Sequence, residues 1–212
     1  MIVTAHQLNF IPGLSVIDRI RRADVVIWLD GAQFVRHGWV NRNKLADGTL
    51  ISVPVNEHDH FAAINHVRLA DPTGRARKKI ARTLQHHFGG QADPFVRELL
   101  RPYAKLAGLN HALIVALFDA LGIQVEHRFQ TFLDTEPALP VVTESGRDIS
   151  LVRERYADMA AQLGADVYLS GPGRHHGDPS TFAEHGIRIE YTDVWEGPNH
   201  SAIELLRERV AA

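Results

Sequence analysis

The sequence predicts an α/β fold with a mainly parallel sheet, and three observations lead to this prediction. Short apolar runs rich in β-branched residues at 1–5 and 24–29 are typical of buried strands. Between them, residues 15–23 repeat apolar side chains at helical spacing, after a serine that suits an N-cap. A strand, a crossover helix and a second strand favour parallel pairing with a right-handed connection.

Strand-like and helix-like segments continue to alternate toward the C-terminus. The run at 49–55 ends at a proline, which indicates an edge strand. We expect further strands at 123–129, 165–171 and 187–193, and helices at 149–164 and 180–186. This alternation predicts a Rossmann-like arrangement of three layers.

Residues 74–121 carry little strand signal and predict a helical insertion. We expect three helices there, divided at Gly89–Gly90 and at 108–110. The length fits one domain over residues 1–212, with 74–121 as a helical subdomain.

The composition excludes several classes of protein. There are no cysteines, so disulfides, thiolate zinc sites and a cysteine nucleophile are ruled out. A net charge of −2 argues against a chain that coats nucleic acid, and the basic run 75–82 is interpreted as a solvated helix face. The absence of a signal segment and of a long apolar run predicts a cytoplasmic protein without membrane contact. The oligomeric state stays open.

Polar residues follow three of the predicted strands at their carboxyl ends. Ligands of open parallel sheets bind beyond those ends, so the sequence outlines a candidate site there. Each residue also has a structural reading, such as capping a turn or holding backbone. The candidates are His6, Gln7, Asp30, Gln33, Ser170 and Gly171.

Two further segments suit an anion. In 41–44, two amides flank Arg42, whose guanidinium can bind a phosphate or carboxylate through two parallel hydrogen bonds, although a solvated turn is the alternative. The glycine-containing loop 170–174 offers backbone N–H groups and Arg174. His58 and His60 lie two residues apart, and no further matched ligands accompany them, so no metal site is assigned. Asn9, Asn41 and Asn43 complete the candidate set.

These segments resemble the WbqC-like family of bacterial proteins. The similar stretches are AHQLNFIPG, DVVIWLDGAQF, NRNK, SVPV, GADVYLSG and the closing SAIELL. The sequence departs from the family pattern at four positions, whereas the polar candidates are retained. Leu8, Gly13 and Ser15 stand where proline, tryptophan and glycine are usual, and Gly31 stands where a second acidic residue is usual. We therefore expect similar chemistry on a different acceptor.

The resemblance implies a role in polysaccharide or specialised-metabolite biosynthesis. Family members are associated with transfer of an amino acid, glycine in particular, onto the amine of an amino sugar. The product of that transfer is an amide. Because a free carboxylate does not react with amines at neutral pH, it must first be activated.

We therefore hypothesise an amide-forming acyl or aminoacyl transferase that binds ATP with Mg²⁺. By analogy with nucleotide-binding α/β folds, His6, Asn9 and a helix N-terminus would contact the phosphates. Two arginines, Arg42 and Arg174, would stabilise developing negative charge. Asp30 would bind the ammonium group of the amino acid, accept a proton from the attacking amine, or ligate Mg²⁺. Gln33, Asn41 and Asn43 would orient small-molecule substrates.

Two alternatives stay open. The first is a non-catalytic ligand-binding or scaffold protein of a biosynthetic cluster. The second is a transferase that takes a pre-activated donor, either a carrier-protein thioester or aminoacyl-tRNA, the one nucleic-acid partner considered. An aminoacyl-tRNA donor would favour a basic surface, which only residues 75–82 offer.

Overall fold

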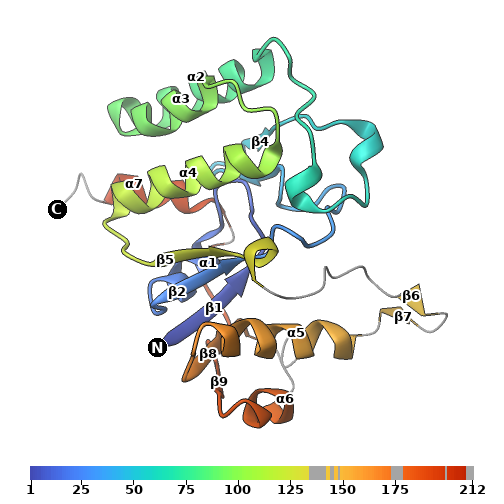
Figure 1. The fold of residues 1–212 in the computed structure, drawn as a ribbon. Helices are drawn as coiled ribbons and strands as arrows, with labels where there is room; N and C mark the ends of the chain where they lie inside the picture. Colours follow the sequence, from blue (N-terminus) through green and yellow to red (C-terminus); the bar gives the residue numbers. More distant parts are fainter. Residues whose placement is uncertain (134–141, 144–145, 148, 173–178, 199, 209–212) are drawn as a thin grey trace. The chain divides into compact units, whose positions relative to one another are not determined.

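The fold of the chain is described from a computed structural model (Figure 1). It describes residues 1–133, 142–143, 146–147, 149–172, 179–198 and 200–208. The chain forms two compact units. The sheet unit consists of Met1–Gln7, Asp18–Gln33 and Val125–Gly197, and the helical unit of Leu8–Ile17, Phe34–Gln124 and Pro198–Ala212.

A five-stranded sheet, parallel throughout, forms the centre of the sheet unit, which confirms the α/β fold class (Figure 1). Its order is β5-β2-β1-β8-β9, so the chain starts in the middle strand. The strands are β1 (Ile2–His6), β2 (Val25–Trp28), β5 (Glu126–Phe129), β8 (Val167–Ser170) and β9 (Arg188–Tyr191). The Rossmann-like three-layer arrangement stays a prediction, because α1 (Leu14–Ile20), the crossover helix, is divided between the units.

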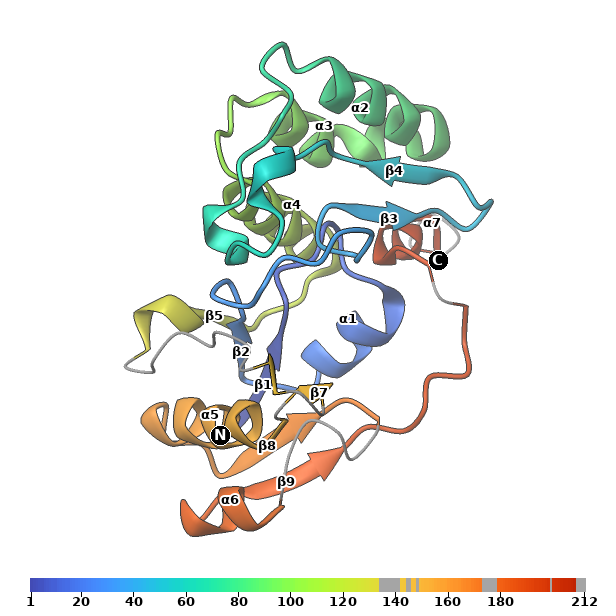
Figure 2. The same cartoon turned by 90° about the vertical axis from the view of Figure 1, so that its right-hand side faces the viewer.

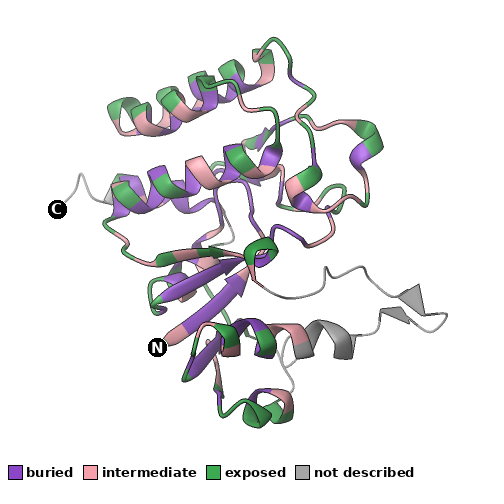
Figure 3. Cartoon of the chain, in the orientation of Figure 1, coloured by how far each residue is buried: buried purple, intermediate pink, exposed green. Residues whose placement is uncertain are grey.

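Helices α5 (Ile149–Gln162) and α6 (Pro179–Glu184) build a core against this sheet. Val3 and Ala5 alternate with polar neighbours along β1 and share one face, where they join Met159 of α5 and Phe182 of α6 in a single apolar cluster. The strands β1 and β2 are buried along most of their length in Figure 3. Parallel strands are commonly buried on both faces, which explains the uninterrupted apolar sequence of β2.

The strand register fixes which residues meet at the carboxyl edge of the sheet. His6 lies opposite Trp28, and Trp28 lies opposite Phe129 on the other side of β2. On the far side of the sheet Ser170 lies opposite Tyr191. Because all of these strands run in the same direction, the residues that end β1, β2, β5 and β8 occupy one edge.

The helical unit contains α2 (Arg75–Phe88), α3 (Asp93–Leu100) and α4 (Leu106–Leu121), as the sequence predicts (Figure 2). The predicted break at 108–110 is wrong, because α4 runs through it and the chain turns at 101–105. A Cβ on Gly108 would lie 3.4 Å from Cδ1 of the Tyr103 ring, an ordinary contact, so this glycine continues the helix and does not mark a break. Among the described helices, none has the length and apolar character needed to cross a membrane.

The predicted strand at 49–55 is one arm of an antiparallel hairpin in the helical unit. It is formed by β3 (Arg42–Lys44) and β4 (Leu50–Ser52). The remaining elements are short. They are η1 (Glu57–Asp59), η2 (Ile64–His66), η3 (Gly89–Ala92), η4 (Gln130–Phe132), β6 (Val142–Thr143), β7 (Gly146–Arg147), η5 (Ala202–Glu204) and α7 (Leu205–Glu208).

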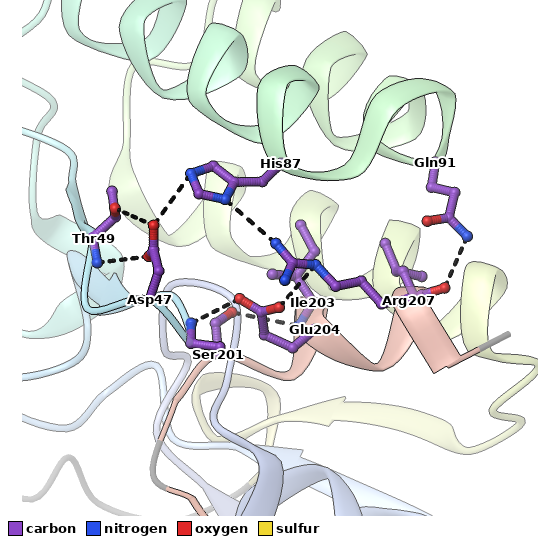
Figure 4. Close-up of polar contacts among 10 residues, drawn as sticks. Asp47, Thr49, His87, Gln91, Ser201, Ile203, Glu204 and Arg207 are labelled. Atoms are coloured by element: carbon purple, nitrogen blue, oxygen red, sulfur yellow. Dashed lines mark hydrogen bonds and ion pairs between the residues drawn. The ribbon is translucent and has the colours of Figure 1, made fainter. Parts of the chain in front are cut away.

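The closing segment of the chain is anchored within the helical unit by polar contacts (Figure 4). Ser201 is fully buried, and its backbone N–H donates to the Lys44 carbonyl at 2.9 Å. The Glu204 carboxylate accepts the Ala46 N–H at 2.8 Å and pairs with Arg207 at 3.3 Å. These contacts make the serine and the apolar helix of SAIELL structural, since both hold the β3–β4 hairpin.

Candidate functional site

His6 and Arg19 form the most informative contact of the sheet unit. The Arg19 Nη2 atom lies 3.0 Å from His6 Nδ1 and 3.3 Å from the Ala5 carbonyl oxygen. A guanidinium can only donate hydrogen bonds, so His6 Nδ1 is the acceptor and the ring proton is on Nε2. His6 is therefore held as the neutral Nε2–H tautomer, a form that donates from Nε2 to an electronegative atom.

Gly171 follows β8 and lies next to the same guanidinium. A Cβ on Gly171 would be 2.5 Å from Arg19 Nη1, closer than nonbonded atoms approach, so Arg19 can occupy this position only beside a glycine. Ser170 is buried at the end of β8, and its backbone carbonyl accepts the Thr192 N–H at 3.0 Å. The structure thus brings His6 and Gly171 together around Arg19.

Asp30 is buried beyond the end of β2, with 5% of its surface exposed. Its carboxylate accepts the Thr131 hydroxyl at 2.7 Å and the Thr131 N–H at 3.1 Å. A carboxylate has lone pairs for about four hydrogen bonds, so these two contacts leave acceptor capacity. Asp30 therefore both orders the segment after β5 and can receive a donor from a ligand.

Gln130 is a second acceptor on this edge, directly after β5. It is 5% exposed, and its Oε1 is shielded from solvent without a hydrogen-bond partner in the described part of the chain. A Cβ on Gly31 would lie 3.2 Å from this oxygen, so the glycine makes room for the amide. A buried acceptor without a donor costs free energy, and a ligand with an N–H group would satisfy it.

Gln7 and Gln33 lie in the sheet unit as well. Gln7 follows β1 directly and is half-buried, as is Gln33 after β2. Their roles stay predictions. Arg174 lies outside the described residues.

The remaining candidates belong to the helical unit, where their amides contact backbone. Asn41 Nδ2 donates to the Val53 carbonyl at 2.9 Å. Asn43 is buried, donates to the Ile11 carbonyl and accepts the Lys44 N–H at 2.7 Å. The Asn43 contact with Ile11 fixes the 8–13 loop against β3. Whether the two amides also orient a substrate stays a prediction.

Two more helical-unit candidates complete the set. Arg42 donates to the His37 carbonyl, and its guanidinium carbon lies 5.8 Å from the centre of the Trp39 ring. Asn9 is nearly buried in the loop after β1. The sequence therefore predicted one site, whereas its residues are distributed over two units.

Three backbone N–H groups at the start of α1 already donate to carbonyls of the protein. Leu14 N–H donates to the His200 carbonyl at 3.2 Å, and the N–H groups of Val16 and Ile17 donate to the Gly13 carbonyl at 3.1 and 3.2 Å. Backbone groups that already donate are poor phosphate ligands. This helix terminus therefore gives little support to the predicted phosphate contact, and side chains are the better candidates for binding an anion.

No cluster suited to a protein-held metal occurs within the described residues, where no three His, Asp or Glu side chains come together. Mg²⁺ usually needs only one or two carboxylates when substrate phosphates supply other ligands. Asp30 is a carboxylate of this kind on the sheet edge. Binding of Mg²⁺ with a nucleotide stays a prediction.

Sequence reasoning missed two residues of this edge, Arg19 and Gln130. The signal for Gln130 was available, because it follows the strand at 123–129 as His6 follows the first strand. Arg19 gave no such signal. It lies within the crossover helix beside Arg21 and Arg22, and only the fold distinguishes it from these exposed neighbours.

Comparison with known proteins identifies the family. The sequence profile of the WbqC-like protein family matches residues 7–202, so the chain belongs to this family. It is also similar to Rv1507c, an uncharacterized protein of Mycobacterium tuberculosis, with 29% identity over 96% of this chain and 92% of the relative. No solved structure gives a significant match.

Proposed function

With membership of the WbqC-like family as the premise, we propose that the chain is an amide-forming transferase. It joins an amino acid, glycine or one of similar size, to the amine of an amino sugar or metabolite. One observation supports this proposal most directly. The carboxyl edge of the sheet carries donors at β1 and acceptors at β2 and β5, a polarity that suits a zwitterionic amino acid.

The donors and the acceptors of this edge would contact different groups of the substrate. The Nε2–H tautomer of His6 is suited to an anionic oxygen of the substrate. Asp30 and Gln130 are suited to ammonium or amine protons, because both present buried oxygen acceptors. The neighbouring parallel strands β1 and β2 lie about 5 Å apart, so groups that follow them, such as His6 and Asp30, can contact the two ends of one small molecule.

In the chemical step, the amine nitrogen attacks the activated carbonyl carbon, the C–N bond forms and the leaving group departs with its electron pair. The nitrogen must lose a proton as it attacks. Asp30 is the proposed acceptor of that proton, a role that contributes about 10²–10⁴-fold to a rate. Within the helical unit, Arg42 is the proposed contact for developing negative charge, and Asn43 holds the loop that precedes α1 through the Ile11 carbonyl.

ATP with Mg²⁺ is the proposed source of activation. The nucleotide would convert the carboxylate oxygen into a leaving group. As an alternative to its role as proton acceptor, Asp30 is the proposed carboxylate ligand of the metal–nucleotide complex. His6 is the proposed contact of the phosphates or of the carboxylate itself.

The test is formation of the amide, followed by mass spectrometry. Purified protein is incubated with isotopically labelled glycine, ATP–Mg²⁺ and a panel of amino sugars. We expect Asp30→Asn to lower the rate by at least about 100-fold and His6→Ala to abolish activity. The control is His185→Ala, since His185 is an exposed histidine of the same unit that pairs with Asp158 at 3.0 Å.

Several results would contradict parts of the proposal. A folded His6→Ala variant with full activity would exclude the assigned role of His6. A wild-type protein that binds glycine but forms no amide with any donor would identify a non-catalytic binding protein.

A pre-activated donor is the second candidate, and one surface feature favours it. Arg75, Lys79 and Arg82 are exposed along one side of α2 and line a common surface depression. Arg77 does not belong to this basic row, because it is buried against Asp71. Amide formation from glycyl-tRNA without ATP, lost when these three residues are replaced by glutamine, would favour this donor.

A further inference from the structure

Arg19 is a cation at the carboxyl edge of the sheet without a described counter-ion. None of the ion pairs between described residues includes it. Its Nε is shielded from solvent and has no described hydrogen-bond partner. Shielded charges in proteins are normally paired, so an arginine with a shielded Nε and no described counter-ion is unusual.

The described neighbours of Arg19 do not supply a negative charge. Tyr156 and Tyr168 lie near the guanidinium, and burial raises the pKa of both phenols, which therefore stay neutral. Burial also lowers the pKa of Arg19, since desolvation disfavours the charged form. The side chain nevertheless stays protonated, because the ordinary pKa of arginine is far above neutrality.

The contacts of the guanidinium hold it in place, and most of its N–H donors have no acceptor among the described residues. The two hydrogen bonds that the structure gives it, to Ala5 O and His6 Nδ1, both come from Nη2. A guanidinium has five N–H donors in a planar fork. Gly171 leaves space for Nη1 at a point where any side chain would displace it.

We infer that Arg19 is the oxyanion-binding residue of the sheet edge, where its guanidinium holds a carboxylate or phosphoryl oxygen of the substrate. The bond from Arg19 to Nδ1 orients the imidazole and fixes the tautomer that donates from Nε2. The same side chain thus supplies a charge and positions a second donor. This inference deepens the proposed function by naming the group that binds its anionic substrate.

The experiment measures stabilisation by anions in thermal unfolding. Wild-type protein, Arg19→Met and the control Arg22→Met are each titrated with inorganic pyrophosphate and, separately, with glycine. Arg22 is a suitable control, because it is exposed and lies three residues further along the same segment. Pyrophosphate tests a phosphate subsite, and glycine tests a carboxylate subsite.

We expect at least one anion, at about 100 times its dissociation constant, to raise the wild-type melting temperature by about 5–10 °C. Arg22→Met retains this rise. Arg19→Met melts within about 3 °C of the wild type without anion, since it removes a charge that has no described counter-ion. Its affinity for the anion falls by at least about tenfold.

Gly171→Ala provides a second variant in which the arginine is still present. Its Cβ would displace the end of a flexible side chain and touch no backbone, so the protein should fold while the guanidinium is misplaced. We expect the same loss of anion binding as in Arg19→Met. Gly90→Ala is the matched control, because a Cβ there meets nothing within 4 Å.

The inference is overturned if Arg19→Met keeps wild-type anion affinity, or if neither anion stabilises the wild type. It is also overturned if Arg19→Met melts far below the wild type and yet binds the anion normally, which is the result expected of a structural arginine. The proposed function fails separately. Anion binding through Arg19 without amide formation would contradict the proposed function and leave this inference standing. Amide formation that is unaffected in Arg19→Met would contradict this inference and leave the proposed function standing.

Discussion

Arg77 of the helical unit is buried and Arg19 of the sheet unit is half-buried with its Nε shielded, and the two guanidinium groups have different partners. Arg77 is 7% exposed, and its Nε pairs with the Asp71 carboxylate at 3.3 Å. Asp71 also accepts the backbone N–H groups of Ala76 and Arg77. Arg19 contacts a carbonyl oxygen and an imidazole nitrogen, with no described carboxylate nearby.

The same contrast holds for neutral side chains. In the helical unit, Asn110 lies within α4 and donates to the carbonyls of Leu8 and Val40, both at 2.7 Å. In the sheet unit, the Gln130 carbonyl oxygen is shielded and has no described donor. The contrast is limited to the amide donors of Asn110, which stabilise the fold, because Asn110 Oδ1 is also shielded without a described partner, as Gln130 Oε1 is.

The largest expected effect is on Arg77. We expect Arg77→Met to lower the free energy of unfolding by about 3 kcal/mol or more, because it leaves the buried Asp71 without its guanidinium. Urea unfolding monitored by circular dichroism measures this loss. The same substitution at Arg19 should change stability little, so equal losses at the two sites would remove the distinction between them.

Asn110→Ala should have the next largest effect. It leaves two buried carbonyls without donors, and we expect a loss of about 2 kcal/mol in unfolding free energy. Asp119→Asn, on an exposed position of the same helix, is the control and should stay within about 0.5 kcal/mol of the wild type. A loss below that level in Asn110→Ala would show that these hydrogen bonds contribute little.

Acid should weaken the helical unit through Asp59. Side-chain and backbone hydrogen bonds from Arg68 lower the pKa of this carboxyl from 3.8 to about 2. A lowered pKa in the folded state means that the stabilisation is complete above pH 4 and is lost as the pH falls toward 2. The stability of wild-type protein should therefore fall more steeply over this interval than that of Asp59→Asn, as acid titration of urea midpoints would reveal.

The smallest expected effect tests the space around Gln130. A Cβ on Gly31 lies 3.2 Å from Gln130 Oε1, so Gly31→Ala should cost about 1 kcal/mol or less through a small shift of the amide. The double variant Gly31→Ala/Gln130→Ala should lose this penalty. A penalty that persists in the double variant would indicate that another neighbour opposes the side chain.

Much of the fold follows from local sequence pattern. The strands at the N-terminus, the helix between them and the parallel sheet were predicted because apolar periodicity and chain direction are local properties. The break in the third helix was misplaced. Gly108 is accommodated by the Tyr103 ring and Asn110 by carbonyls from distant segments, neither of which a local pattern contains.

The candidate site was predicted in part, for the same reason. The end of a strand can be read from the chain, so His6, Asp30 and Ser170 were assigned to the sheet edge. The two asparagines of NRNK were equally suited to a ligand by sequence, yet both contact backbone carbonyls of the helical unit. Partners decide what a polar side chain does, and these partners are far away in sequence.

The sequence by itself determined the family and the α/β class, and it predicted which residues end the strands at one edge, because these depend on motif, periodicity and strand direction. Only the tertiary structure decided which polar groups already have partners. It distinguished Arg19 from the exposed Arg22, and it showed that Arg77 has a carboxylate partner, Asp71, whereas Arg19 has none among the described residues. The physical reason is that burial and hydrogen bonding are fixed by segments that meet only in the folded chain.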